Sequence, residues 1–126
     1  MLESCVTYSV LPASDLQRAT AWYRDKLELE PERTEDQGVL YGTGSAAKIY
    51  LYETGNAGTA QNTAMCWLVP DIEAALAHLR DRGVVFEDYD FPGLKTVEHV
   101  CVLGAEKAAW FLDTEGNILC LHEDLT

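Results

Sequence analysis

Apolar residues recur at helical spacing in two segments of the chain. In the first, which follows Ser14, they appear every three or four positions, at Leu16, Ala19, Tyr23 and Leu27. This spacing predicts an amphipathic helix. Ser14 with Gln17 three residues later fits a capping box at the start of that helix.

The second segment follows Pro70 and has the same character. One stripe holds Ile72, Ala75 and Leu79. Asp71 fits the N-cap of a helix, and Gly83 fits the residue that closes it. We therefore predict a second helix between Asp71 and Gly83.

The two predicted helices are copies of one unit. At the 56-residue offset between Asp15 and Asp71, five positions are identical: Asp15/Asp71, Ala19/Ala75, Ala21/Ala77, Arg24/Arg80 and Asp25/Asp81. A second match, at an offset of 70 residues, relates segment 49–53 to segment 119–123 through Leu51/Leu121 and Glu53/Glu123. The chain therefore repeats itself.

Runs of β-branched and aromatic residues complete each repeat. One run precedes each helix, from Val6 and from Ala64, and others follow at 39–41, 48–52, 84–86, 99–103, 108–112 and 118–122. This order predicts an α+β fold with two paired βαβββ modules, at 5–54 and 64–124, in one domain with a polar linker at 55–63. The larger second offset places an insertion in the second module, and we expect residues 88–96, which include Pro92-Gly93, to form a loop.

Charge and cysteine content restrict the partners and the compartment. The 126 residues carry a formal net charge of −12, so nucleic acid and anionic membranes are unfavourable partners. The same charge would favour a cationic ligand, although acidic residues that only keep the protein soluble are the simpler explanation. No stretch approaches the roughly 20 apolar residues of a membrane span. The four cysteines form no C-x-x-C pair, and we expect reduced thiols and a cytoplasmic location.

Three segments carry a resemblance to a known family. They read LPASDLQRATAWYRDKLEL (11–29), VPDIEAALAHLRDRGV (69–84) and KAAWFLDTEGNILCL (107–121). Together they resemble the vicinal oxygen chelate superfamily, which holds glyoxalase I, extradiol dioxygenases and bleomycin-resistance proteins. The resemblance implies that each module curls into a mixed sheet with a concave cup. It also implies a homodimer, since related proteins often share cups across a two-fold interface.

The resemblance implies where a metal would bind. Metal-dependent members hold one divalent ion with four side chains, usually His, Glu, His and Glu. The corresponding positions here are Tyr8, Tyr50, Ala64 and Cys120. Alanine has no donor atom and a neutral phenol is a poor ligand. We therefore expect no metal at these positions and no cofactor.

The alternation of side chains along a strand indicates which residues line the predicted cups, because residues i and i+2 share a face. We expect the ligand-binding residues to be Tyr8, Tyr50, Tyr52, Cys66, Trp110, Cys120 and His122. Such a lining suits a flat organic ligand, held by stacking and one or two hydrogen bonds. The alternative is that these rings only fill the core.

These features predict a metal-independent protein of the bleomycin-resistance type that binds an aromatic or cationic small molecule. The alternative is an enzyme, a lyase, isomerase or dioxygenase. Its site would be a metal site rebuilt from Cys66, Cys120, His122 and a tyrosine, or a metal-free site with Tyr8 or Tyr50 as an acid. A third alternative is an interaction module with a vestigial cup. A buried cysteine is by default a small hydrophobic residue, so we expect Cys66 and Cys120 to be unreactive.

Overall fold

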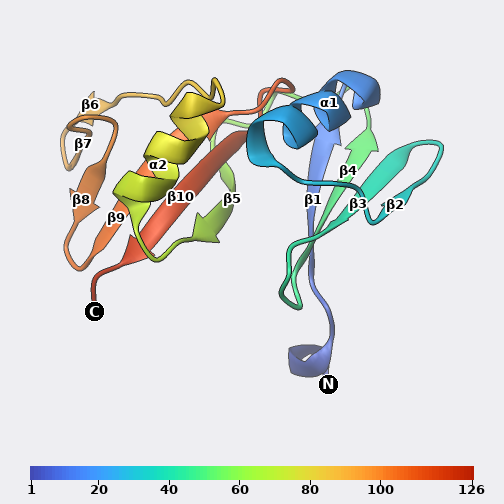
Figure 1. The fold of residues 1–126 in the computed structure, drawn as a ribbon, viewed down its shortest axis with the longest axis horizontal. Coiled ribbons are helices and arrows are strands. Elements are labelled where there is room, and N and C mark those ends of the chain that lie inside the picture. Colours follow the sequence, from blue (N-terminus) through green and yellow to red (C-terminus); the bar gives the residue numbers. More distant parts are fainter. The chain divides into compact units, whose positions relative to one another are not determined.

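The computed structural model describes residues 1–126 and contains two helices and ten strands (Figure 1). The first part of the chain forms a 3-10 turn, η1 (Leu2–Ser4), then β1 (Tyr8–Ala13), α1 (Leu16–Leu27), β2 (Arg33–Thr34), β3 (Gly38–Gly42) and β4 (Lys48–Glu53). The second part forms β5 (Thr63–Leu68), α2 (Ile72–Asp81), β6 (Asp90–Phe91), β7 (Leu94–Lys95), β8 (Cys101–Leu103), β9 (Glu106–Leu112) and β10 (Ile118–Asp124). Neither helix is long and apolar enough to cross a membrane.

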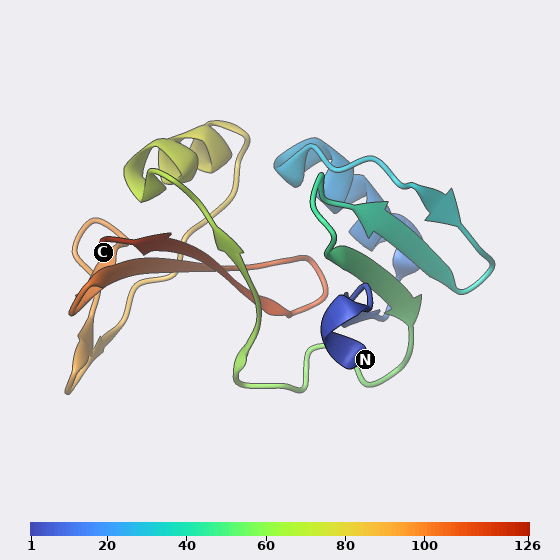
Figure 2. The ribbon, with the colours of Figure 1, turned by 90° about the horizontal axis from the view of Figure 1, so that it is seen from below.

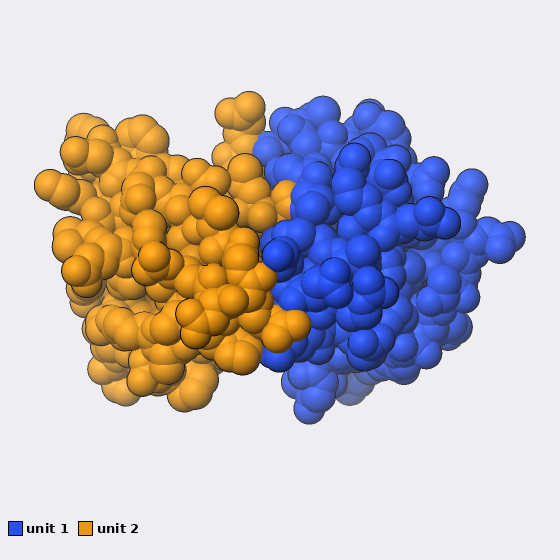
Figure 3. All heavy atoms as spheres, turned by 45° about the horizontal axis from the view of Figure 1, so that its top comes forward, with its two compact units in different colours: residues 1–60, 114–117 blue, residues 61–113, 118–126 orange.

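The chain divides into two compact units, coloured separately in Figure 3. Unit 1 comprises residues 1–60 together with 114–117, and unit 2 comprises residues 61–113 together with 118–126. The turn between β9 and β10 therefore belongs to unit 1, whereas both strands that it joins belong to unit 2.

Unit 1 is one four-stranded mixed sheet with a helix on one face. The strand order is β1-β4-β3-β2, in which β1 and β4 run parallel and the other pairs antiparallel. Tyr23 of α1 stacks on Tyr41 of β3 at a ring-centroid distance of 5.8 Å. The face under α1 is therefore the apolar one, and it also holds the buried residues Leu11, Ala13, Val39, Ile49 and Leu51.

Unit 2 repeats this plan. Its sheet has the order β5-β10-β9-β8, again with one parallel pair, β5 and β10. The face under α2 holds Phe111, which stacks on Trp67 at 6.2 Å and meets Phe86 edge to face at 5.3 Å. Figure 2 shows each helix over one face of the sheet of its own unit. The predicted α+β fold with a repeated βαβββ module is confirmed.

The helix starts are only partly as predicted. Asp71 is the N-cap of α2 and accepts a hydrogen bond from the Ala74 amide at 3.1 Å, as predicted. The N-cap of α1 is Asp15, not Ser14, because the Asp15 carboxylate accepts from the Arg18 amide at 3.0 Å. The capping box at Ser14 is therefore wrong. The repeated aspartate, found by the 56-residue offset, is the cap of both helices.

Two predictions for the segment after α2 are also wrong. Residues 84–86 form no strand, since only Phe86 makes an isolated bridge, to Phe111. Val84 and Phe86 are apolar because they are buried in the core, where packing needs no strand ladder. Residues 88–96 are not a plain loop but contain the short antiparallel hairpin of β6 and β7, with Gly93 at φ 84° in its turn.

Candidate functional site

Each sheet has one face that does not pack on its helix, and we call it the open face of that sheet. On the first sheet the open face carries Tyr8 and Val10 of β1 together with Tyr50 and Tyr52 of β4. Their exposed fractions are high for large side chains: 49% for Tyr8, 55% for Val10 and 38% for Tyr52. The three predicted tyrosines therefore do share a face.

The register does not bring these tyrosines into one row. Tyr50 lies opposite Val10, Tyr52 lies opposite Pro12, and Tyr8 lies opposite Lys48. Adjacent rows on one face stand roughly 6.6 Å apart along the strands. The tyrosines therefore occupy three successive rows, Tyr8 on β1 and Tyr50 and Tyr52 on β4.

Tyr50 is fixed in position by its neighbours. Its hydroxyl donates a hydrogen bond to Glu35 at 3.2 Å, and Glu35 also pairs with Arg33 at 2.9 Å. Its ring lies across Gly38, where an added Cβ would stand 2.9 Å or less from three atoms of the phenol. Desolvation, with the hydrogen bond and charge of Glu35, raises the pKa of Tyr50. A phenol in this setting stays protonated and can pack against a ligand or form a hydrogen bond with it, but it is a poor metal ligand.

On the open face of the second sheet, one cross-strand row holds three of the predicted residues. Cys120 of β10 lies opposite Cys66 of β5 on one side and opposite Trp110 of β9 on the other. By the 56 and 70 offsets of the repeat, Cys66 and Cys120 correspond to Val10 and Tyr50 of the first sheet. This row is thus the counterpart of the row that holds Tyr50.

Trp110 is held by contacts that the sequence did not reveal. Its indole N–H donates to the Thr63 hydroxyl at 3.1 Å. Tyr89, which precedes β6, meets the Trp110 ring edge to face at 5.4 Å and stacks on Phe91 at 5.7 Å. The short hairpin of β6 and β7 therefore contributes aromatic rings beside the predicted tryptophan. These rings could not be assigned from parity alone, because the segment was predicted as a loop.

His122 lies one row beyond the cysteines, opposite Ala108 and Leu68. Its Nε2 is 2.8 Å from an oxygen of Glu106, and it is about three-tenths exposed. Glu106 was missed, although parity on β9 places it on the same open face as Ala108 and Trp110. The imidazole is thus oriented by a carboxylate rather than by a thiol.

The two thiols of this row differ sharply. Cys66 is exposed and Cys120 is buried. A hydrogen bond from Cys120, helped by the nearby His122, outweighs desolvation and lowers the pKa of Cys66 to about 7. The interaction with Cys66 and burial both raise the pKa of Cys120. Cys66 therefore combines exposure with a lowered pKa, as reactive thiols do, whereas Cys120 is buried with a raised pKa.

The residues at the family's metal positions do not fit a divalent ion. Ala64 offers no donor atom, Cys120 is held as a neutral thiol, and the Tyr50 hydroxyl is bound to Glu35. Tyr8 is the one remaining donor of the four, and hard ions in proteins take several oxygen or imidazole ligands. A set of this kind does not support metal-dependent chemistry at these positions.

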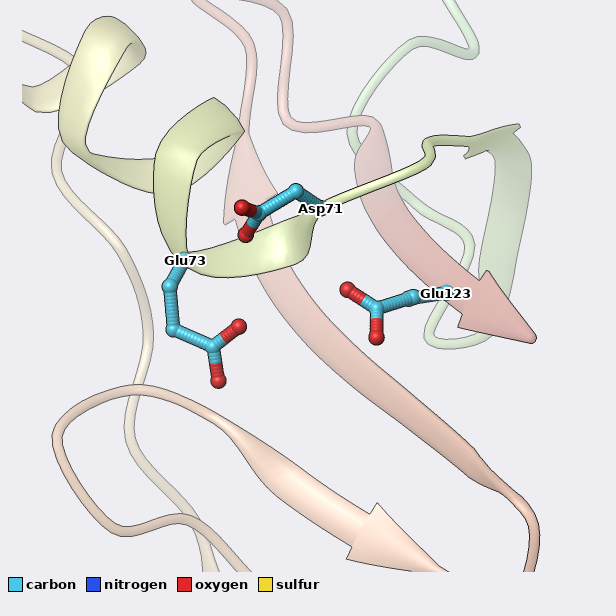
Figure 4. A group of neighbouring side chains, drawn as sticks. All are labelled: Asp71, Glu73 and Glu123. Carbon is cyan, nitrogen blue, oxygen red and sulfur yellow. The ribbon is translucent and has the colours of Figure 1, made fainter. Parts of the chain in front are cut away.

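Three carboxylates do gather elsewhere, at the start of α2 (Figure 4). Oxygen atoms of Asp71, Glu73 and Glu123 lie within 4.8 Å of one another. Each is already engaged: Glu123 accepts from the Ile72 amide at 2.7 Å, Asp71 caps the helix, and Glu73 pairs with Lys107 at 2.8 Å. This cluster lies on the helix side of the second sheet, and we explain it as the cap of a helix N-terminus.

A groove of about 610 Å³ also lies on the helix side, in unit 1. It runs between the first turns of α1 and the segment around β2, and its charged lining includes Asp15, Arg24, Glu35, Asp36 and Glu53. The sequence did not predict it, since strand parity addresses only the open face. Glu53 corresponds by the repeat to Glu123, which accepts a hydrogen bond from the Ile72 amide at the start of α2.

Glu115, in the turn between β9 and β10, is the buried charge of unit 1. One carboxylate oxygen accepts from the backbone amides of Ser14 and Asp15 at 2.9 and 3.0 Å, and the other accepts from Arg18 at 2.9 Å. Although desolvation opposes ionisation, these hydrogen bonds and that of Thr114 lower the pKa of Glu115 to about 2. Glu115 therefore anchors the start of α1.

Solved structures share this fold over nearly the whole chain. A glyoxalase/bleomycin resistance protein from Catenulispora acidiphila is 23% identical with a TM-score of 0.68, covering 95% of this chain and 98% of its own. TnmS3, an antibiotic binding protein from a Streptomyces species, is 19% identical with a TM-score of 0.68 and covers 98% of both chains. A lactoylglutathione lyase from Agrobacterium tumefaciens is 19% identical with a TM-score of 0.68, covering 95% of this chain and 93% of its own.

At these identities the structural matches show the fold alone. No curated protein matches the chain. The family model described as Glyoxalase/Bleomycin resistance protein/Dioxygenase superfamily matches residues 6–121. This range covers both helices and all ten strands, apart from the last three residues of β10, and leaves out the η1 turn. The chain therefore belongs to the glyoxalase, bleomycin resistance protein and dioxygenase superfamily, as the resemblance of its three segments implied.

Proposed function

We propose that this protein binds an organic small molecule on the open faces of its sheets, without a divalent metal ion. The observation that carries the proposal is the exposed aromatic and apolar surface of those faces, with Tyr8 49% and Tyr52 38% exposed. Rings of this kind bind flat organic molecules through stacking and burial of apolar surface. The four residues at the metal positions of the family supply too few donor atoms to hold an ion, so we do not expect the ligand to be bound through a metal.

Charge favours a cationic ligand. The chain carries a net charge of −12, and carboxylates border the aromatic residues of both open faces. Glu35 lies at the Tyr50 hydroxyl and Glu106 lies at His122. A cation over an aromatic face gains about 0.5–2 kcal/mol, depending on how far it is desolvated. A cationic aromatic compound therefore matches both the rings and their borders.

The similarity to TnmS3, an antibiotic binding protein, supports a binding role rather than a catalytic one. The similarity to a lactoylglutathione lyase supports the same fold, but the ligand positions Tyr8, Tyr50, Ala64 and Cys120 depart from a metal-binding set. We further propose a cytoplasmic homodimer, in which a second copy covers the edge strand β1 with its exposed Tyr8 and Val10.

Calorimetric titration tests the proposal. Chelator-treated protein is titrated with a panel of cationic aromatic antibiotics and metabolites, and at least one compound is expected to show saturable binding. Tyr8→Ala and Tyr52→Ala should each weaken that binding by about tenfold, from roughly 1–1.5 kcal/mol per lost aromatic contact. Val102→Ala is the matched control, since Val102 is 61% exposed but pairs with Lys107 on the helix side of the second sheet.

The same samples separate a binder from an enzyme. Mass spectrometry of the ligand after prolonged incubation should return it unchanged. A product that forms in proportion to protein concentration would instead support the enzyme alternative. If no compound of the panel binds saturably, the proposal fails.

A further inference from the structure

Cys66 and Cys120 face each other across two neighbouring parallel strands. They are register partners in the pairing of β5 with β10, and both are free thiols. Adjacent strands lie about 4.8 Å apart. A disulfide requires a Cα separation of roughly 4.4–6.8 Å. Oxidation can therefore join these two residues without moving the strands.

The two thiols occupy different environments, which gives each a separate role. Cys66 is exposed on edge strand β5, where a small reagent can reach it, whereas Cys120 is 5% exposed. With its pKa lowered to about 7, Cys66 is more ionised at neutral pH than an ordinary thiol. Cys120 is held as a thiol by its interaction with the Cys66 sulfur and by burial. Cys66 is therefore the attacking group, with a protonated partner beside it.

We propose that Cys66 and Cys120 form a thiol–disulfide exchange site whose substrates are low-molecular-weight disulfides. The Cys66 thiolate attacks one sulfur of the small disulfide, whose S–S bond breaks and releases the first thiolate, which takes a proton from water. Cys120 then loses its proton to water and attacks the Cys66 sulfur, which releases the second small thiol. The protein dithiol is oxidised to a disulfide, and the small disulfide is reduced to two thiols.

The environment of Cys120 favours the second step. The charge of the Cys66 thiolate and the hydrogen bond to it both hold the proton on Cys120. Once Cys66 is in a mixed disulfide, that charge is gone, so Cys120 ionises more readily. Its sulfur is then next to the one that it must attack, since the two residues are direct register partners.

The observations favour this two-sulfur chemistry over a soft-metal site with His122 as third ligand. The imidazole is engaged by Glu106 at 2.8 Å. The three ligand atoms that do gather within 4.8 Å in this chain are carboxylates at the start of α2, not Cys66, Cys120 and His122. Thiol exchange requires only the two residues that the register places together.

The test uses the full chain with Cys5→Ser, since Cys5 is a second exposed thiol. The reduced protein is mixed with glutathione disulfide at neutral pH and followed by intact-mass and peptide mass spectrometry. We expect a transient glutathione adduct, then a product that has lost two hydrogen atoms, with the peptides of Cys66 and Cys120 cross-linked. Addition of reduced glutathione should restore the starting mass.

Two further variants assign the roles. In the Cys5→Ser background, Cys120→Ser should trap the glutathione adduct on Cys66, and Cys66→Ser should leave the protein unmodified. Cys120→Ala replaces Cys120→Ser if the hydroxyl impairs folding, as judged by circular dichroism. A stable adduct on Cys66 in the presence of Cys120, or no reaction at Cys66, would overturn the proposal. No small-molecule ligand is needed, so the outcome is independent of the proposed binding function.

Discussion

Replacing Glu115 by glutamine tests how the start of α1 is held. The carboxylate is 5% exposed and accepts hydrogen bonds from the Ser14 and Asp15 amides and from Arg18. Glutamine keeps one acceptor oxygen for the amides. Its NH₂ group, however, faces the Arg18 guanidinium with a donor where an acceptor is needed, and the charge is lost.

The size of the effect follows from the pKa of Glu115. Its value of about 2 lies well below the ordinary 4.5. At about 1.4 kcal/mol per pKa unit, this difference corresponds to about 3 kcal/mol of stability at neutral pH. The Arg18 side chain of the pair is half exposed, so solvent screening keeps the loss from exceeding this value. We therefore expect Glu115→Gln to lower the free energy of unfolding by about 3 kcal/mol at pH 7.

The assay is urea unfolding at several pH values. Because the pKa of Glu115 is lower in the folded state, its contribution is complete above pH 5 and is lost as the pH falls towards 2. The glutamine variant does not titrate there, so the difference between variant and wild type should shrink over that range. Glu73→Gln is the matched control, since its ion pair with Lys107 is exposed and should contribute less than about 1 kcal/mol.

A loss below about 1 kcal/mol, equal to that of the control, would refute this reasoning. So would a difference between Glu115→Gln and wild type that stays constant from pH 7 to pH 2. Either result would mean that the buried carboxylate is no better stabilised in the folded chain than in water.

Three further predictions concern the site and its supports. Gly38→Ala should displace the Tyr50 ring, since the new Cβ would meet the phenol, and should lower the free energy of unfolding in urea by about 1–3 kcal/mol. Gly55→Ala is the control and should leave that free energy unchanged, because there is open space around Gly55. Gly116→Ala should cost at least about 1 kcal/mol, because Gly116 has φ 85° and its Cβ would lie 2.8 Å from the Gly58 Cα. Alkylation of Cys66 by iodoacetamide, measured by peptide mass spectrometry, should accelerate through pH 7, and Cys120→Ala should move that midpoint upward because the hydrogen bond to Cys66 is lost.

The fold could be predicted because the sequence contains two copies of the same βαβββ module. The two helices follow from apolar spacing, and the offsets of 56 and 70 residues align Asp15 with Asp71 and Glu53 with Glu123. The structure explains why these residues repeat. Asp15 and Asp71 cap the two helices, and Glu123 accepts a hydrogen bond from the Ile72 amide at the start of α2. Strand parity also placed Cys66 and Cys120 on one face, and the predicted Trp110 lies in the same row.

What the sequence did not show depends on tertiary contacts. Val84 and Phe86 look like a strand but are buried without a ladder. Glu115 looks like a turn residue, and only folding brings it to the start of α1, a hundred residues earlier in the chain. The distinct states of Cys66 and Cys120 depend on their register across β5 and β10, which periodicity alone does not fix.

The central claim is that the protein binds its ligand on aromatic open faces without a metal ion. The most direct test measures the affinity for a cationic aromatic compound on chelator-treated protein, and again after separate loading with manganese, iron, nickel and zinc. The account predicts saturable binding with the same dissociation constant in every sample, weakened by Tyr8→Ala. Binding that appears only after one of these ions is added would contradict it.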